Sequence, residues 1–406
     1  MKLNQHLKDW QQIISSRFDH LSLPQIKGLA TWRTSHVSEV SSETVSLTFG
    51  MVMTQSSSLS KVSALIAKLN GESENTVRQR LKEWYKSGAE KSKKGNQRAS
   101  LEVKDCFGSL LSWIIALLPE NNRELALAMD ATNIGQHFTV LSINVLYRRG
   151  AIPVAWKVIR GKLKGSWKPH WQELYQSLQG IVPKNYLVIV SADRGLYADW
   201  LYQEIVALGW HPFLRINHQG YYQQENTSSW QPLATILTDK NQSWSGQVTC
   251  FKKNSLTCTL LAHWGEDYSD PWLVLTDLSP NQADINWYQL RCWIECSYRD
   301  FKSDGFDWHK TRLSHPDRAE RHWLAMSVAM LWMLILGGEQ EVFHQELLVS
   351  ERQPTNSITF TPSLSCFVRG LLTVVAQLLN EQSLSFGRLF PFDINRFHHC
   401  ALLNSS

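Results

Sequence analysis

The spacing of apolar residues along the chain changes near residue 110. Before that point, apolar residues fall on one side of short helical patterns, with polar residues between them. After it, nearly continuous apolar runs such as YLVIVSAD (186–193) are typical of buried strands, and they alternate with amphipathic patterns typical of helices. This alternation over residues 124–336 predicts an α/β core with a mixed sheet and helices packed on it.

The individual elements follow from the same pattern. An apolar helix over 110–119 ends at Pro119, and three adjacent strands come after it. Asp130 closes the first of these strands, and Asp193 closes a later one. The predicted strands are 124–130, 138–150, 152–161, 186–193, 211–217 and 271–278, and the later helices are 167–179, 197–209, 284–302 and 319–336.

Residues 218–270 interrupt this core with polar sequence rich in Gln, Asn, Ser and Thr. Two short alternating runs in it, QVTCFKK and SLTCTLLAHW, predict antiparallel strands. We therefore expect a β-rich insertion between two parts of the core, 120–217 and 271–340. The insertion carries three tryptophans: Trp230, Trp244 and Trp264.

Two short amphipathic helices are predicted ahead of the core. They are Ser60–Asn70 and Glu74–Trp84, with Gly71 breaking the pattern and Ser73 placed as an N-cap. This arrangement fits a helix-turn-helix over 60–84, although an ordinary helical hairpin is the alternative. The second helix would turn outward residue types that contact base edges and phosphates: Asn75, Thr76, Arg78, Gln79 and Arg80.

Positive charge is concentrated just after these helices. The chain has 41 basic and 36 acidic residues, but Arg78 to Lys104 alone holds nine basic residues against three acidic ones. We expect an exposed basic linker over 86–104 that meets phosphate, and an ordinary solvated surface is the alternative. Residues 1–110 would then form a helical DNA-binding region, and 341–406 a C-terminal region for dimer or DNA contacts.

Composition narrows the remaining classes. With 43% hydrophobic and 19% charged residues among 406, the chain is neither mainly disordered nor a simple coiled coil. Seven cysteines without a C-x-x-C pair argue against a disulfide framework or a zinc site and indicate reduced core thiols. The longest apolar run, Trp323 to Leu336, is shorter than a membrane span and predicts a buried core helix. Because the N-terminal residues lack the apolar region of a signal peptide, we expect a soluble intracellular protein.

Two aspartates at predicted strand ends are candidate catalytic groups. Asp130 and Asp193 each follow an apolar strand, and strand ends are where sites form in such sheets. Taken one at a time, each is more often a turn or N-cap aspartate. Together at the ends of neighbouring strands they form a candidate site for Mg²⁺, which takes oxygen ligands.

A third acid lies on the predicted helix 284–302. At about 100° per residue, four polar side chains fall within a roughly 60° sector of that helix. They are Tyr288, Arg291, Glu295 and Lys302. A separate buried stripe is formed by Leu290, Ile294 and Phe301. The alternative is a solvated face stabilised by an Arg291–Glu295 pair, which the tyrosine and lysine in register make weaker.

These residue types fit phosphodiester chemistry. Three carboxylates can hold two metal ions about 3.5–4 Å apart, which activate an attacking oxygen and stabilise a leaving one. Two Mg²⁺ ions are expected, with Mn²⁺ as a common substitute at oxygen sites. Arginine and lysine beside the acids would bind the flanking phosphates, and the tyrosine hydroxyl could add one more hydrogen bond.

Three motifs resemble those of a known family. The spacing Y-x₂-R-x₃-E-x₆-K from Tyr288 to Lys302 resembles the YREK signature of DDE transposases of bacterial insertion sequences, in the group named after insertion sequence 4. AMDATN around Asp130 and SADRGLYADW around Asp193 are similar to that family's first two acidic motifs. The β-rich stretch between Asp193 and Glu295 also matches, since this group carries a β domain there.

The resemblance implies an RNase H-like core in which Asp130, Asp193 and Glu295 are the metal ligands. It also implies that Tyr288, Arg291 and Lys302 hold the phosphates of the DNA end, and Arg194 is a further candidate for that contact. Family members cut double-stranded DNA at the terminal inverted repeats of their element and join the ends to target DNA. A homodimer on paired ends and a bacterial, cytoplasmic, nucleoid-associated protein are expected on the same ground.

In the better-known members, water attacks the end phosphodiester, and the released 3′-hydroxyl attacks the opposite strand to give a hairpin. Such a hairpin needs a flipped base stacked on an aromatic ring. Trp230, Trp244 and Trp264 are the candidates, with a packing role as the alternative for each.

Two other functions compete with a transposase. A catalytically inactive DNA-binding regulator derived from one would keep the basic region, but the intact acidic motifs argue against it. A carbohydrate enzyme would also use paired carboxylates and tryptophans. The basic segment and the missing signal peptide argue against that enzyme.

Overall fold

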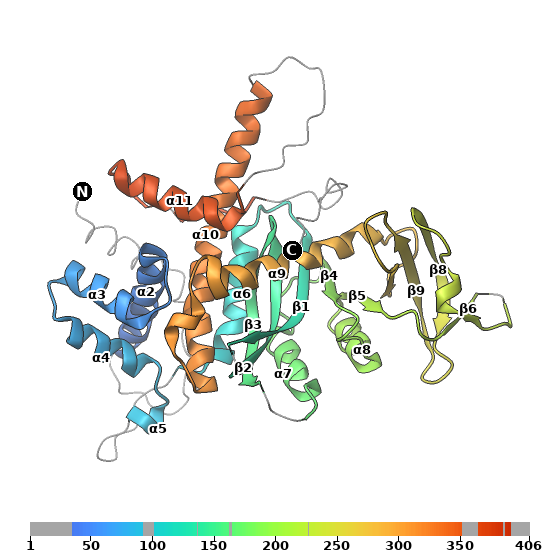
Figure 1. Ribbon diagram of the computed structural model, residues 1–406, viewed down its shortest axis with the longest axis horizontal. Helices are drawn as coiled ribbons and strands as arrows, with labels where there is room; N and C mark the ends of the chain where they lie inside the picture. Colours follow the sequence, from blue (N-terminus) through green and yellow to red (C-terminus); the bar gives the residue numbers. More distant parts are fainter. Residues whose placement is uncertain are drawn as a thin grey trace.

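The computed structural model describes residues 35–91, 101–135, 137–161, 165–225, 227–350, 364–384 and 386–390. Among these, one mixed sheet of ten strands runs from the middle of the molecule to one end (Figure 1), in the order β3-β2-β1-β4-β5-β10-β9-β8-β6-β7. The strands are β1 (Glu124–Ile134), β2 (Phe138–Tyr147), β3 (Gly150–Arg160), β4 (Leu187–Ala192), β5 (His211–Ile216), β6 (Tyr221–Gln224), β7 (Gln231–Pro232), β8 (Gln242–Cys250), β9 (Leu256–Trp264) and β10 (Trp272–Thr276).

The two halves of the sheet differ in direction. In the first half, β3, β2 and β1 form an antiparallel meander, and β4 and β5 then add parallel to β1. Antiparallel neighbours need only tight turns, whereas each parallel step needs a crossover. Helices α7 (Lys168–Leu178) and α8 (Asp199–Ala207) supply the two crossovers. The prediction of a mixed sheet with packed helices is confirmed.

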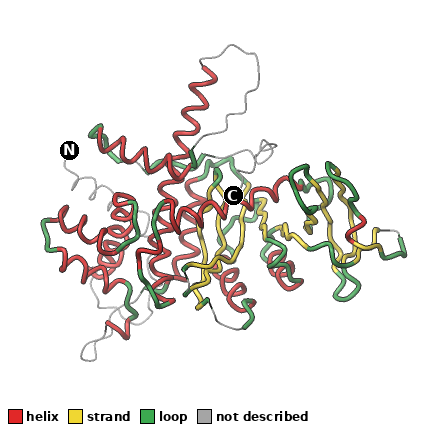
Figure 2. The backbone as a smooth tube through the Cα atoms, viewed as in Figure 1, coloured by secondary structure: helices red, strands yellow, loops and turns green. Residues whose placement is uncertain are grey.

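The second half of the sheet is wholly antiparallel. Strands β6, β7, β8 and β9 lie in the polar stretch 218–270, together with the short 3₁₀ helix η3 (Leu233–Thr235). They join the first half through β10, which pairs with β5 on one side and β9 on the other. Figure 2 shows the result, with strands in the centre and at one end and helices gathered at the other end.

Helices cover both faces of the central strands. Side chains alternate between faces along β1, so Met129 and Asp130 point to opposite sides. The Tyr175 hydroxyl of α7 contacts Met129 Sδ at 3.0 Å, whereas Asp130 faces the helical segment 285–304. Helix α6 (Phe107–Leu117), preceded by η2 (Val103–Cys106), packs against α7 and β3. The prediction of an apolar helix ending before Pro119 is confirmed.

The N-terminal helices pack against the long helix α10 (Pro316–Ser350). They are α2 (Ser35–Thr54), which the sequence pattern did not predict, α3 (Leu59–Asn70), α4 (Glu74–Trp84) and the short α5 (Gly88–Lys91). Helix α2 packs directly on α10, and Thr48 Oγ1 donates to the Ala325 carbonyl at 3.4 Å. Residues 92–100 of the predicted basic linker, and residues 1–34, lie outside the described residues.

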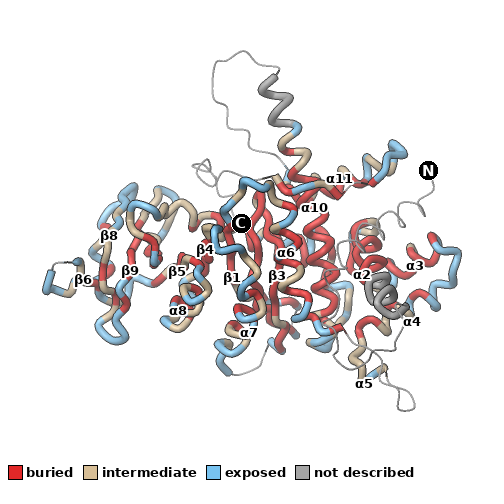
Figure 3. The backbone as a smooth tube through the Cα atoms, turned by 180° about the vertical axis from the view of Figure 1, so that it is seen from behind, coloured by how far each residue is buried: buried red, intermediate tan, exposed pale blue. Residues whose placement is uncertain are grey.

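Helix α10 forms the core of the helical end. By length and composition it could cross a membrane, but 94% of its apolar window is buried inside the protein (Figure 3). The prediction that Trp323 to Leu336 is a buried core helix is therefore confirmed. Helix α11 (Cys366–Leu379) packs on it through Gly337 and Gly370. A Cβ atom at either glycine would lie 1.8–2.0 Å from a carbonyl oxygen of the other helix, so only glycine allows this approach.

Two predicted boundaries change in the structure. Strand β1 runs on to Ile134 and does not stop at Asp130, because β2 pairs with it from Leu127↔Val145 up to Ile134↔Phe138. The predicted helix 284–302 is three successive helical segments, not one α-helix. They are the 3₁₀ helix η4 (Ile285–Cys292), α9 (Trp293–Arg299) and the π-helical η5 (Asp300–Asp304), followed by the 3₁₀ turn η6 (Trp308–Thr311).

Candidate active site

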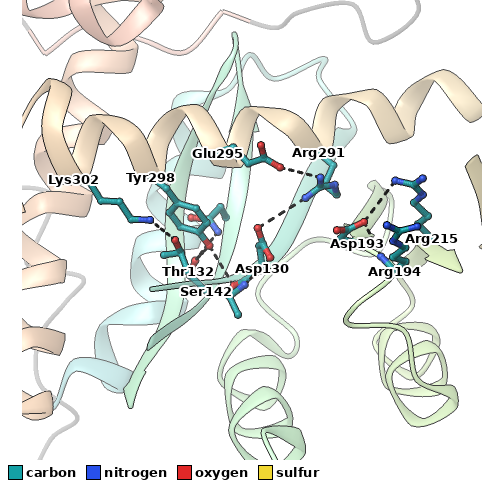
Figure 4. A network of polar contacts seen from close by, with 12 residues as sticks. Asp130, Thr132, Ser142, Asp193, Arg194, Arg215, Arg291, Glu295, Tyr298 and Lys302 are labelled. Carbon is teal, nitrogen blue, oxygen red and sulfur yellow. Dashed lines mark hydrogen bonds and ion pairs between the residues drawn. The ribbon is translucent and has the colours of Figure 1, made fainter. Parts of the chain in front are cut away.

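The register of β1 and β4 brings the two aspartates together. The last parallel pair is Met129↔Ala192, so Asp130 and Asp193 are the next residues on adjacent strands. Strand β4 stops there because residues 194–196 form a turn, in which Leu196 N donates to the Asp193 carbonyl. Asp130 stays within β1, held opposite Ser142 of β2. Both carboxylates therefore lie at the end of β4, on neighbouring strands (Figure 4).

Glu295 reaches this site from α9, which crosses the same face of β1. Arg291, one turn earlier, lies between the acids. Its Nη2 is 3.0 Å from Glu295 Oε1, and its Nη1 is 3.9 Å from Asp130 Oδ2. The arginine side chain is only 15% exposed, whereas that of Glu295 is 60% exposed. The predicted Arg291–Glu295 pair exists, but it belongs to the acidic site and not to a solvated helix face.

The three acids act on one another electrostatically. Burial raises the pKa of Asp130, and the charges of Glu295 and Asp193 raise it further. The hydrogen bond from the Ala131 amide and the charge of Arg291 oppose this increase in the pKa. Like charges held this close favour binding of a cation, because a cation relieves their repulsion.

The acids have the chemistry of a site for a hard divalent cation. Asp130, Asp193 and Glu295 supply carboxylate oxygens, the ligand type that Mg²⁺ prefers. No three His, Cys, Asp or Glu side chains converge closely enough to hold one ion within the part of the chain that the structure describes. Because Arg291 lies between Asp130 and Glu295, these two acids would have to draw closer to share an ion.

A second arginine, Arg215, lies on the other side of the acids. It projects from β5, and its Nη1 is 3.9 Å from Asp193 Oδ1. Sequence reasoning missed this residue, although it is the one charged residue in the apolar run HPFLRIN. The predicted Arg194 instead directs its guanidinium to Asp270, at 3.5 Å, while its backbone amide donates to Asp193 Oδ1 at 2.8 Å.

Lys302 lies on the same face, farther along the helical segment. Its Nζ donates to Thr132 Oγ1 at 2.7 Å, and burial lowers its pKa. Thr132 is two residues beyond Asp130, so both side chains are on one face of β1. Tyr298, another residue that the sequence reasoning missed, lies between Glu295 and Lys302 on the helical segment and contacts the Asp130 carbonyl at 3.3 Å.

Tyr288, which the family resemblance implies would hold a phosphate of the DNA end, lies inside the protein in this structure. Its side chain is buried at right angles to the Trp272 ring, with the ring centroids 5.2 Å apart. Its hydroxyl has no hydrogen-bond partner among the described residues, and burial raises its pKa to about 12. A 3₁₀ helix places residues i and i+3 one above the other, so Tyr288 lies directly under Arg291 and inside the core.

The predicted helix pair is present as α3 and α4, joined by Gly71 in the left-handed conformation at φ 71°. The Ser73 side chain caps α4 by accepting from the Thr76 amide. Arg78 is exposed as expected. Arg80 is not free, because both of its terminal nitrogens bond to Glu72 at 2.9 and 3.1 Å.

The three tryptophans of the β-rich stretch differ in their surroundings. Trp244 packs on the core and against Gly246 and Tyr222, and Trp264 donates its ring N–H to the Tyr268 carbonyl at 3.0 Å. Packing is thus the observed role of both. Trp230 is half-buried, and it does not belong to the described hydrophobic core cluster.

A known protein family matches part of the chain. Residues 169–334 match the family model described as the transposase DDE domain. The match supports a DDE transposase. The matched segment includes Asp193, Glu295 and the β-rich stretch between them, whereas Asp130 lies before the segment.

Other comparisons add little to the transposase match. No curated protein matches the chain. Among solved structures, the chain is similar to a piggyBac transposase synaptic complex with hairpin DNA, at 10% identity and a TM-score of 0.33. That similarity covers 89% of this chain and 84% of the other, and it is too distant to carry an argument.

Proposed function

We propose that this chain is an active DDE transposase that cuts DNA at the terminal inverted repeats of its own element and joins the ends to target DNA. The observation that carries the proposal is that Asp130, Asp193 and Glu295, from three separate elements, lie around Arg291 on one face of the sheet. The order β3-β2-β1-β4-β5, three antiparallel strands followed by two parallel ones, supports an RNase H-like core. The YREK spacing favours the group named after insertion sequence 4.

The proposed chemistry divides among the residues of this face. Asp130, Asp193 and Glu295 would hold two Mg²⁺ ions, or Mn²⁺ in their place. Bound there, the ions supply Lewis acidity at the scissile phosphate. Arg291 and Arg215 lie beside the acids, where each would exchange a carboxylate for a phosphate oxygen as the DNA backbone enters.

The DNA strands would pass through the reaction in order. Water first attacks the end phosphodiester and releases a 3′-hydroxyl. That hydroxyl would then attack the phosphodiester of the opposite strand, which forms the hairpin and releases the flanking DNA with its own 3′-hydroxyl. Opening of the hairpin by water and attack of the regenerated 3′-hydroxyl on target DNA would reuse the same carboxylates. Lys302 and Arg194 are placed on either side of the acids to bind flanking phosphates.

Other parts of the chain have proposed roles in holding the ends. Helix α4 would lie against DNA with Arg78 toward the phosphates. Arg80 would either stay paired with Glu72 and orient that carboxylate, or release it to bind a phosphate. Trp230 is the favoured ring for a flipped base, because Trp244 and Trp264 are used in packing. Two copies on paired ends, working on the nucleoid in the cytoplasm, complete the proposal.

A cleavage assay tests the proposed function. Labelled duplexes taken from the DNA that flanks the gene on each side would be incubated with the chain in Mg²⁺ or in chelator. Cuts at repeat ends that require Mg²⁺ and disappear in Asp130→Ala, Asp193→Ala and Glu295→Ala are expected, with DNA binding retained. Asp277→Ala is a matched control, since Asp277 pairs with His211 at the opposite end of β5.

The possible results separate the functions. A denaturing gel of the same products shows whether a hairpin forms. Binding without cleavage in either Mg²⁺ or Mn²⁺ would favour the inactive regulator. Cleavage retained by all three alanine variants would contradict an active site at these acids.

A further inference from the structure

A chain of buried hydrogen bonds lies directly beneath the acidic site. The Tyr298 hydroxyl of α9 is 2.7 Å from Ser142 Oγ and 3.3 Å from the Asp130 carbonyl oxygen. Asn144 Nδ2 is 2.9 Å from the same Ser142 Oγ. All three side chains are buried, so these bonds form away from competing water.

The donors and acceptors in this chain have one consistent order. A carbonyl oxygen only accepts, and an amide NH₂ only donates. Tyr298 must therefore donate to Asp130, which leaves Ser142 to donate to Tyr298 and Asn144 to donate to Ser142. Burial raises the pKa of Tyr298, which keeps its hydroxyl protonated as this order requires.

The position of Tyr298 makes this bond relevant to the acids. Tyr298 follows Glu295 by three residues, so the two lie about one helical turn apart on α9. Its partner is the backbone of Asp130 itself. The bond therefore sets the distance between the helical turn that carries Glu295 and the strand residue that carries the second carboxylate.

The side chain of Glu295 is otherwise weakly held. It is 60% exposed, and Arg291 is its one hydrogen-bond and ion-pair partner among the residues that the structure describes. A second tie between helix and strand exists farther along, from Lys302 to Thr132, but it lies beyond Tyr298 and away from Glu295. Loss of the Tyr298 hydroxyl would thus free the turn at Glu295 while leaving the far end attached.

We propose that Tyr298 is a positioning residue, whose hydroxyl holds the Glu295 turn of α9 against Asp130 and so keeps these two acids within reach of one divalent cation once Arg291 turns to phosphate. This inference rests on the proposed function. Hydrogen-bond partners behind metal ligands commonly change metal affinity or activity about 10- to 100-fold when they are removed. Carboxylates displaced by even about 0.5 Å lose the geometry that such sites need.

The test compares two buried tyrosines on opposite faces of β1. Tyr298→Phe removes the hydroxyl that bonds to Asp130. Tyr175→Phe is the matched control, because its buried hydroxyl contacts Met129, the neighbouring residue, on the other face. Each full-length variant is measured for Mn²⁺ affinity by electron paramagnetic resonance, for unfolding temperature, for duplex binding and for cleavage at increasing Mg²⁺.

We expect Tyr298→Phe to weaken Mn²⁺ binding about tenfold and to shift half-maximal cleavage to correspondingly higher Mg²⁺. Cleavage at saturating Mg²⁺ should recover most of the lost rate, and duplex affinity should be unchanged. Tyr175→Phe should lower the unfolding temperature to a similar extent without moving either metal response. If Tyr298 only stabilised the fold, saturating Mg²⁺ would not restore cleavage in Tyr298→Phe.

Several results would overturn the inference. It fails if both variants change the metal response equally, or if Tyr298→Phe loses stability with unchanged Mn²⁺ affinity. Should Tyr298→Phe not fold, Ser142→Ala takes its place, since it removes one support of the hydroxyl, and an unchanged metal response then counts against the proposal. Mn²⁺ bound equally by wild type and Glu295→Ala, or wild type that never cuts, would instead count against the proposed function.

Discussion

The helix pair α3–α4 and the helical segment 285–304 use polar residues in opposite ways. On α4 the polar residues face solvent, and their contacts are local: Ser73 caps its own helix and Arg80 pairs with Glu72. Along 285–304 the polar residues face the sheet. Arg291 and Lys302 contact strand residues more than 150 positions away in the sequence.

The electrostatic environments of the two regions differ accordingly. The exposed Glu72 has its pKa lowered by the hydrogen bond and charge of Arg80. The buried Asp300 has its pKa raised to about 7, by burial first and by the charge of Asp304 second. One region thus pairs its charges at the surface, whereas the other buries a group whose ionisation is opposed by desolvation. Three variants can break or sharpen this contrast.

The largest effect is expected for Arg291→Ala. It removes the cation between Asp130 and Glu295, so cleavage should fall about 100-fold or more while duplex affinity changes little. Arg291→Lys should be intermediate, because lysine keeps the charge but lacks the planar fork. Single-turnover cleavage with saturating enzyme measures the change.

Arg123→Ala is the control for this prediction. Arg123 is exposed just before the start of β1, at the opposite end of the strand from Asp130. The Arg123→Ala variant should cut DNA at the wild-type rate. Equal losses in the two variants would show that any arginine near this sheet serves only to bind DNA.

A smaller effect is expected for Arg78→Ala on α4, and this variant should lose DNA affinity while it keeps its cleavage rate. Its side chain is exposed, so its loss should weaken duplex binding about tenfold and reduce the salt dependence by about one phosphate contact. Cleavage at saturating DNA should stay unchanged. Binding titrations at several salt concentrations give both values, with the exposed Lys184→Ala as a control. A wild-type salt slope in Arg78→Ala would remove α4 from the DNA interface.

The last prediction concerns stability and pH at Asp300. The folded chain keeps a proton on Asp300 up to about pH 7, whereas the unfolded chain releases it near the ordinary pKa of 3.8. The free energy of unfolding contributed by this group therefore falls as pH rises from about 4 to 7, by about 1 kcal/mol per pH unit. Asp300→Asn should remove this part of the pH dependence.

Urea unfolding at pH 5, 6 and 7 measures the difference in free energy of unfolding between wild type and Asp300→Asn. The contributions of the other titrating groups cancel in this difference. In Asp304→Asn the fall in stability with rising pH should end at a lower pH than in wild type, since the Asp304 charge helps to raise the pKa of Asp300. Parallel pH curves for wild type and Asp300→Asn would show that Asp300 is ionised in the folded chain.

Local patterns predicted much of the molecule for clear physical reasons. The apolar runs of β4 and β5 and the apolar stretch of α10 are buried as expected, because burying their side chains is what stabilises these elements. The spacing of apolar residues and a glycine also located α3 and α4 within one residue of their ends. These features depend on neighbours in the sequence, so the sequence contains the information needed to find them.

The details of the acidic site were harder to predict. The wheel calculation assumed one regular α-helix over 284–302, whereas η4 and η5 change the number of residues per turn on either side of α9. Tyr288 is buried against Trp272, whereas Tyr298, which the same wheel places only about 20° from Arg291, faces Asp130. Arg215 was overlooked because one charge in an apolar strand has meaning only when the neighbouring strand is known.

The sequence by itself determined most of the strands and helices, although not α2. It also showed that basic residues gather near the N-terminal helices and which three acids are candidates for catalysis. Only the tertiary structure decided how these acids meet. The β1–β4 register aligns Asp130 with Asp193, and hydrogen bonds between α9 and the strands set the approach of Glu295. Periodicity is a property of a single element, but the distance between two carboxylates depends on how separate elements pack, and that packing is decided by contacts between residues far apart in the chain.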